Sequence, residues 1–121
     1  MTTPIAERVN ALQEYIRTGR ILEAMDEFYA PEVEMRENGG TPTKGLAANI
    51  EREKQFLAGV KEWKGYTVRS LNTGADTSAV EAVMEFTATD GTPVRLEQVA
   101  VQTGKDGKIV SERFYYDASR K

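Results

Sequence analysis

Apolar residues in the first half of the chain recur every three or four positions, which is the spacing of amphipathic helices. The pattern predicts helices over residues 4–18, 21–29 and 45–61. Gly19 suits the end of the first helix, because glycine readily adopts the left-handed conformation found there. Pro31 ends the second helix, because the residue before a proline disfavours helical geometry.

One short segment in this half, residues 33–37, alternates in polarity like a half-buried strand. Val33, Met35 and Glu37 fall on one face, so the apolar side of the strand ends in a carboxylate. Residues 38–42, Asn-Gly-Gly-Thr-Pro, predict a loop because all five favour turns.

The last third of the chain contains strand-like runs separated by two Asp-Gly pairs. Asp90-Gly91 and Asp106-Gly107 predict type I′ hairpin turns, which need two residues at positive φ. We therefore expect strands at four places, the last three as an antiparallel meander: residues 66–71, 79–89, 93–103 and 108–116. Helices first and a meander last predict one α+β domain over residues 1–121.

Composition says little about the fold but excludes several kinds of catalytic and metal site. The chain has no cysteine and no histidine, which excludes thiolate nucleophiles, Ser–His triads and histidine-ligated metals. No metal site is expected, because no Asp-rich loop has calcium-binding spacing. A net charge of −3 with scattered basic residues argues against nucleic-acid binding. No apolar run is long enough for a membrane span and no secretory signal is visible, so we expect a cytoplasmic protein that does not bind membranes.

Several motifs together suggest a family: the helix break at Gly19, Phe28-Tyr29-Ala30-Pro31-Glu32-Val33, Glu37-Asn38-Gly39-Gly40, Asp106-Gly107-Lys108-Ile109-Val110 and Phe114-Tyr115-Tyr116-Asp117. Over nearly its whole length the chain resembles the nuclear transport factor 2-like superfamily, in particular its SnoaL-like and ketosteroid-isomerase-like branch. The resemblance implies a cone-shaped α+β fold, with three N-terminal helices packed on a curved antiparallel sheet around an apolar pocket. Members include isomerases, cyclases, dehydratases and non-catalytic binding domains, and many form dimers, so the fold alone does not determine function.

The resemblance implies that Glu37 is a general base, because isomerase-like members carry a carboxylate at the end of the early strand. A carboxylate at the mouth of an apolar pocket is partly desolvated, which makes it a better base. The alternative is an exposed loop-edge glutamate beside Arg36. Two departures weigh against a steroid-isomerase mechanism. Leu12 stands where that family has an oxyanion-stabilising tyrosine, although Tyr15 lies one turn further on, and Val99 stands where it has a protonated aspartate.

Glu97 is the second candidate acid or base. It lies two residues before Val99 and shares its strand face, so a pocket-facing Val99 also places Glu97 in the pocket. Leu96 and Gln98 would then face outward. The opposite orientation stays open because this strand is only weakly amphipathic, and a cross-strand salt bridge with a nearby arginine is the simpler interpretation of Glu97.

Glu112, Phe114 and Tyr116 share one face of the last strand, and the register from the preceding turn directs that face to the pocket. A buried tyrosine hydroxyl needs a hydrogen-bond partner, and Glu37 or Glu112 could supply it to Tyr116. Tyr116 is therefore a candidate catalytic residue.

The expected ligand-binding residues come from several elements: Tyr15, Phe28, Met35, Trp63, Val99, Glu112 and Phe114. Trp63 follows the third helix, where relatives often line the pocket mouth. Simple core packing is the alternative for the aromatic members of this set.

Two functions agree with these residues. In the first, the protein is an isomerase, cyclase or lyase in which Glu37, alone or with Glu97, removes a proton next to the carbonyl group of a small apolar ligand. Tyr116 or Tyr15 then donates a hydrogen bond to the enolate, and no cofactor is needed. In the second, the chain is a binding or dimerisation domain that forms homodimers through the convex face of the sheet. Burial distinguishes them, because carboxylates converging in a dry pocket are costly without a function.

Overall fold

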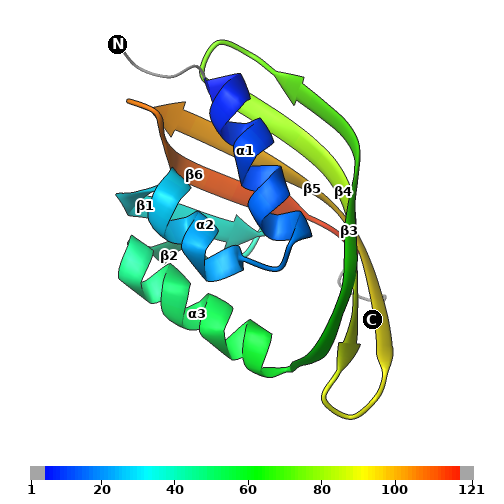
Figure 1. Cartoon of the computed structure of the whole chain (residues 1–121). Helices are drawn as coiled ribbons and strands as arrows, with labels where there is room; N and C mark the ends of the chain where they lie inside the picture. The colour runs from blue at the N-terminus through cyan, green and yellow to red at the C-terminus, as the bar shows by residue number, and fades with distance from the viewer. Residues whose placement is uncertain (1–4, 118–121) are drawn as a thin grey trace.

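The computed structural model describes residues 5–117. Its elements follow one another along the chain as α1 (Ile5–Arg17), α2 (Ile21–Phe28), β1 (Tyr29–Glu37), β2 (Thr43–Lys44), α3 (Leu46–Ala58), β3 (Val60–Thr73), β4 (Thr77–Ala88), β5 (Pro93–Lys105) and β6 (Lys108–Tyr115) (Figure 1). The predicted start of the first helix at Pro4 lies outside the described residues. None of the described helices is both long and apolar enough to cross a membrane.

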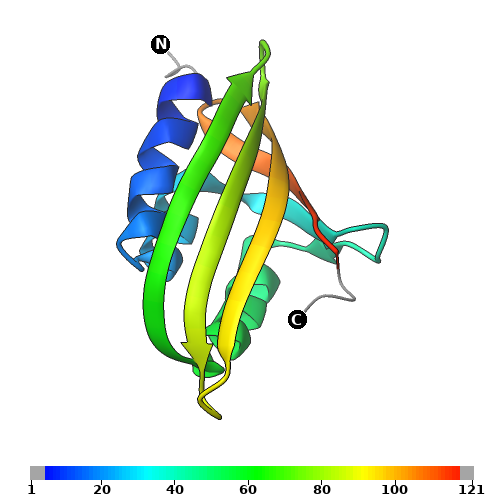
Figure 2. The ribbon, with the colours of Figure 1, turned by 90° about the vertical axis from the view of Figure 1, so that its right-hand side faces the viewer.

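The six strands form one curled sheet in the order β2-β1-β6-β5-β4-β3. Strands β3, β4 and β5 form the near side in Figure 2, and the helices lie behind them, on the inner face of the curl. The sheet is antiparallel, as expected, except at one pairing: β1 pairs with β6 in parallel. These two strands are far apart in sequence, and no hairpin constrains their direction.

The meander is confirmed: β4, β5 and β6 pair antiparallel in succession. Asp106 (φ 54°) and Gly107 (φ 80°) both have positive φ, as a type I′ turn requires. The first turn differs from the prediction, because only Gly91 of its Asp-Gly pair has positive φ (89°). There the Asp90 carboxylate accepts the Thr92 backbone N–H at 2.9 Å.

Strand β3 is longer than its polarity predicts. It begins at Val60, directly after α3, and pairs with β4 along its whole length. Three irregularities in the β3–β4 register accompany the bending of the sheet. The residues before Tyr66 belong to this long strand because of that pairing, which local polarity does not reveal.

The core fills the space between the helices and the inner face of the sheet. Deeply buried apolar side chains come from five of its elements: Val9, Leu12, Met25, Val33, Val80 and Ile109. Each such side chain contributes about 1.5–3 kcal/mol by leaving water. The helices spread over the inner face of the sheet, with α1 against β3 and β4 and α3 against β1 and β2.

Candidate functional site

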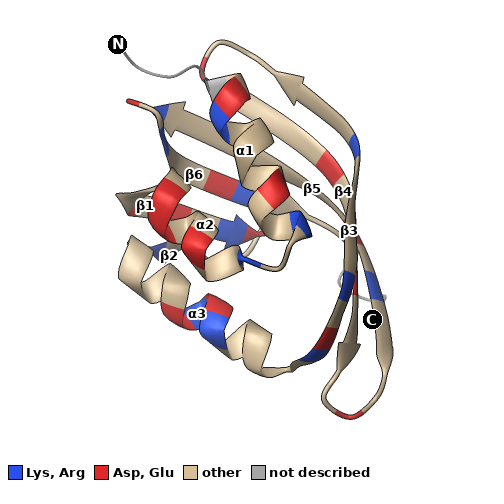
Figure 3. Ribbon diagram, in the orientation of Figure 1, with Lys and Arg blue, Asp and Glu red and all other residues tan. Residues whose placement is uncertain are grey.

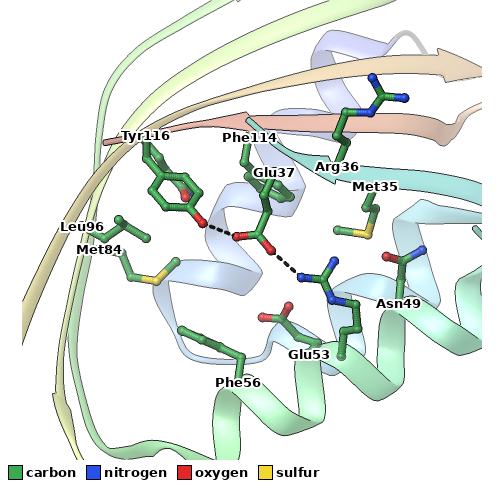
Figure 4. A pocket seen from close by; sticks show the side chains of 12 residues that line it. Met35, Arg36, Glu37, Asn49, Glu53, Phe56, Met84, Leu96, Phe114 and Tyr116 are labelled. Atoms are coloured by element: carbon green, nitrogen blue, oxygen red, sulfur yellow. Dashed lines mark hydrogen bonds and ion pairs between the residues drawn. The ribbon is translucent and has the colours of Figure 1, made fainter. Parts of the chain in front are cut away.

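A cavity of about 300 Å³ opens between α3 and the inner face of the sheet. Five elements supply its apolar wall: Met35, Phe56, Met84, Leu96 and Phe114. Five ionisable residues are on its lining: Arg36, Glu37, Arg52, Glu53 and Tyr116. The Arg36 side chain points away from Glu37 and Glu53 (Figure 4). An apolar cavity with a few convergent polar groups is typical of a small-molecule site.

Glu37 lies at the mouth of this cavity and is bound on both sides. The Tyr116 hydroxyl donates to one carboxylate oxygen at 2.5 Å, and the Arg52 guanidinium contacts the other at 2.5 Å. The Glu37 and Arg52 side chains are 42% and 49% exposed, so this ion pair faces solvent on its outer side. The hydrogen bond to Glu37 is the main reason that the pKa of Tyr116 rises to about 12, which keeps its phenol protonated near neutral pH.

Asn38 brings Glu37 and Tyr116 together. Its backbone N–H donates to the Phe114 carbonyl oxygen at 2.7 Å, and its side-chain oxygen accepts the Tyr116 N–H at 3.0 Å. Its backbone has φ 52°, a left-handed conformation that asparagine tolerates better than most residues. This residue therefore joins the end of β1 to the end of β6.

Glu53 projects from α3 into the same cavity. Burial, followed by the negative charges of Glu112 and Glu37, raises the pKa of Glu53 from 4.5 to about 7, while Arg52 opposes the shift. Its carboxylate makes no hydrogen bond or ion pair with any described residue. Unlike Glu37, it is free to accept a proton from a ligand.

A smaller space of about 70 Å³ lies deeper in the fold, and Met35, Glu53, Met84, Gln98 and Phe114 line both cavities. We call it the inner cavity, and the larger one the outer cavity. The remaining polar groups of the inner cavity are Gln13, Tyr29, Tyr66, Gln102 and Glu112.

Glu112 is almost fully buried at the inner cavity and is held by two donors. It accepts the Tyr29 hydroxyl on one oxygen and the Gln102 amide at 2.8 Å on the other. Desolvation raises the pKa of Glu112, and these two hydrogen bonds oppose that rise. The position of Glu112 on the inner face agrees with the prediction from strand register.

A family model for the SnoaL-like domain matches residues 1–116. The chain belongs to the SnoaL-like family. No protein of curated function matches it by sequence.

Solved structures share this SnoaL-like fold. A proposed SnoaL-like polyketide cyclase from Mesorhizobium loti is 25% identical over 94% of this chain and 100% of that chain, with a TM-score of 0.78. A nuclear transport factor 2-like protein of unknown function from Burkholderia pseudomallei is 17% identical over 97% and 93% of the two chains, with a TM-score of 0.84. A proposed isomerase from Bacillus subtilis is 18% identical over 93% and 85%, with a TM-score of 0.77. The last two show likeness of fold alone.

Four predicted residues of this SnoaL-like chain meet at the outer cavity: Met35, Glu37, Phe114 and Tyr116. They come together because β1 and β6 pair in parallel, with Glu37 opposite Phe114. Their positions agree with the prediction, and the chemical roles proposed for them stay predictions.

The predicted orientation of Glu97 and Val99 is wrong. Leu96 and Gln98 line the outer cavity, while Glu97 lies on the other face of the sheet. There the Glu97 carboxylate contacts Arg69 at 2.6 Å and Arg95 at 3.2 Å. The orientation of β5 follows from its pairing with β4. Leu96 pairs with Met84, which faces inward, and Glu97 pairs with the residue before Met84, which faces outward because successive residues of a strand point to opposite faces.

Besides Val99, three predicted ligand contacts lie outside both cavities: Tyr15, Phe28 and Trp63. Tyr15 and Phe28 pack edge to face, with ring centroids 5.2 Å apart. Trp63 packs against the core, and its buried indole N–H has no acceptor among the described residues. Tyr15 and Phe28 serve packing because α1 and α2 meet each other there.

Glu53 was missed because it lies in a run of mixed charges on α3, which is typical of a solvated face (Figure 3). A signal was nevertheless present. Leu46, Ile50, Glu53 and Leu57 follow the helical spacing of three to four residues, so Glu53 falls on the apolar face of α3.

Proposed function

We propose that this SnoaL-like protein binds a small, largely apolar carbonyl compound in the outer cavity and moves a proton at the carbon beside the carbonyl group. The observation that carries the proposal is the unpartnered Glu53 carboxylate in an apolar cavity that also presents Tyr116 and Arg52. The chemistry is that of an isomerase or cyclase, and it needs only side chains.

Glu53 is the proposed general base. Its pKa of about 7 suits proton transfer near neutral pH, where a base must be ionised and still hold a proton well. The Glu53 carboxylate takes the proton from the α-carbon, and the electron pair of that C–H bond forms the C=C bond of an enolate. Return of the proton to another carbon gives an isomer. Alternatively, the enolate carbon attacks a second carbonyl carbon and closes a ring, and the alkoxide formed there takes the proton back from Glu53.

Tyr116 and Arg52 stabilise the enolate oxygen in this proposal. Both donors lie at the mouth of the cavity and are held in place by Glu37. Tyr116 has one hydroxyl hydrogen, so donation to the enolate replaces its hydrogen bond to Glu37. The raised pKa of Tyr116 keeps that hydrogen on the phenol near neutral pH. One well-placed donor of this kind stabilises a developing oxyanion by about 3–4 kcal/mol. Glu37 is a positioning residue here, and direct proton abstraction by Glu37 is the alternative that the family resemblance implies.

The relatives support the reaction class. The M. loti protein is described as a proposed polyketide cyclase and the B. subtilis protein as a proposed isomerase. Ring closure between two carbonyl groups begins with removal of a proton beside one of them, and one class of isomerisation begins in the same way. The substrate of this chain is therefore proposed to belong to the same broad class of enolisable ketones.

Hydrogen–deuterium exchange tests the proposal. A panel of enolisable ketones is incubated with the protein in D₂O, and exchange at the α-carbon is followed by NMR. We expect the rate to rise with pH through about 7. Glu53→Gln should lower it about 100-fold or more, and Glu51→Gln, an exposed neighbour on the same helix, should leave it unchanged.

Three outcomes would overturn parts of the assignment. Loss of exchange in Glu37→Gln with normal exchange in Glu53→Gln would make Glu37 the base. Equal rates in the wild type and Glu53→Gln at every pH would exclude general-base catalysis by Glu53. Absence of exchange across the whole panel would favour the second candidate.

The second candidate function is binding or dimerisation without catalysis. Leu12 is buried in the core and Val99 lies on the outer face of the sheet, so neither position supplies a donor to the cavity. The outer face instead exposes Tyr115 beside Val99 and Val101. We propose this face as the contact surface of a homodimer in either case.

A further inference from the structure

The inner cavity is rich in hydrogen-bond acceptors. The Tyr29 hydroxyl donates its hydrogen to Glu112, and the Tyr66 hydroxyl donates to Gln13 at 2.6 Å. Each phenol has one hydrogen, so both phenol oxygens are left as acceptors. Two carboxylates, those of Glu53 and Glu112, share the same lining.

The nearest cation to these carboxylates on either lining is Arg52 of the outer cavity, which is paired with Glu37 and offsets the charge of Glu53 only in part. The lining of the inner cavity contains no lysine or arginine among residues 5–117. The negative charge of Glu112 contributes to raising the pKa of Glu53, so the two groups destabilise each other when both are ionised. A buried charge without a partner is costly, and a bound cation would remove that cost.

The inner cavity also has the size and surface for a small organic cation. A cavity needs a volume of about 10–15 Å³ to hold one water molecule, and the inner cavity has a volume of about 70 Å³. Aromatic rings attract cations, and those of Tyr29, Tyr66 and Phe114 are on its lining. Met35 and Met84 line both cavities, so they could cover an alkyl chain that extends from the inner cavity into the outer one.

We propose that the inner cavity binds the ammonium group of an alkylamine, with Glu53 and Glu112 as its anionic partners and the alkyl chain directed into the outer cavity. An ammonium group has three donors and no acceptor, which complements the acceptors on this lining. This ligand class is inferred from the inner cavity alone and does not depend on the proposed proton transfer.

The surroundings of Glu53 make the binding depend on pH. The charged and titratable groups that face it are Tyr29, Glu37, Arg52, Tyr66, Glu112 and Tyr116. With a pKa of about 7, Glu53 is mostly neutral at pH 6 and mostly ionised at pH 8. An alkylamine resembles lysine, whose pKa is near 10.4, so it stays cationic at both pH values. Affinity should therefore increase with pH.

NMR titration with n-butylammonium chloride, and with n-butanol as the neutral analogue of the same length, tests the proposal. At pH 8 we expect the amine to bind about tenfold or more tightly than the alcohol, which corresponds to 1.4 kcal/mol. At pH 6 the amine should bind about tenfold more weakly than at pH 8, following the ionised fraction of Glu53. The butanol affinity should not change with pH.

Two variants complete the design. Glu53→Gln should weaken binding of the amine at pH 8 about tenfold, to its wild-type value at pH 6, and abolish its pH dependence, whereas Glu51→Gln should behave like the wild type. Equal affinities for the amine and the alcohol at pH 8, or amine binding that Glu53→Gln does not change, would overturn the proposal. Binding is measured without turnover, so its result is separate from that of the exchange assay.

Discussion

Glu53 leaves water for a largely buried position on the lining of the outer cavity when the chain folds. Its pKa rises from 4.5 to about 7, with burial as the largest cause. A carboxyl group with a raised pKa binds its proton more tightly in the folded state than in the unfolded state. Its contribution to stability is therefore greatest below pH 4.5 and is lost as the pH rises through about 7.

Replacing Glu53 by Gln should remove the free-energy cost of ionising this carboxyl group in the folded protein. The variant should gain stability relative to the wild type as the pH rises from 4.5 to 7, and the gain should level off above that range. The full change is at most about 3 kcal/mol, since one pKa unit corresponds to 1.36 kcal/mol. Urea denaturation at pH 4.5, 6 and 8 measures it, with Glu51→Gln as the control. A difference in stability that is the same at all three pH values would contradict the assignment.

At the scale of elements, the site depends on the hydrogen bonds that join the end of β1 to the end of β6. The two strands are parallel neighbours, and Asn38 joins them through its backbone N–H and its side-chain oxygen. Glu37 and Tyr116 meet because these ends are joined. The contact between them should therefore loosen when the Asn38 side chain is removed.

A pair of substitutions separates the contribution of the Asn38 side-chain hydrogen bond from that of its left-handed backbone conformation. Asn38→Gly keeps the left-handed backbone accessible and removes the hydrogen bond to Tyr116, so it should cost about 1 kcal/mol. Asn38→Ala removes the same bond and adds backbone strain, so it should cost about 1–2 kcal/mol more than glycine. Thermal or urea unfolding measures both. An alanine variant as stable as the glycine variant would show that the left-handed conformation at this position carries no strain.

Elements with local signals could be predicted from the sequence, and those that depend on distant pairing could not. The meander followed from two Asp-Gly pairs, and the inward face of β6 followed from its register. The orientation of β5 was predicted wrongly, because Glu97 and Gln98 differ little in polarity and only pairing with β4 decides which faces inward. Glu53 was overlooked because its charge concealed its place on the apolar side of α3.

At the scale of the whole molecule, we propose the outer face of the sheet as the contact surface for a second copy of the chain. Val99 pairs with Tyr115, and Val101 lies beside them. Tyr115 is 42% exposed, which is unusual for a large apolar residue in this structure. Charges of both signs surround these residues, including Glu97 and Arg95. In a two-fold dimer each patch meets its own copy, so the arginines of one subunit could face the glutamates of the other.

Val99→Glu tests this surface, because a buried and unpaired charge at the centre of an apolar contact opposes association. We expect the wild-type protein to sediment as a dimer at micromolar concentration and Val99→Glu to sediment as a monomer. Gln55→Glu makes the same change of charge on the exposed side of α3 and should sediment as the wild type does. Sedimentation equilibrium distinguishes the states, and circular dichroism verifies that each variant is folded. A wild-type monomer at every concentration, or a dimer that persists in Val99→Glu, would exclude this face as the contact between subunits.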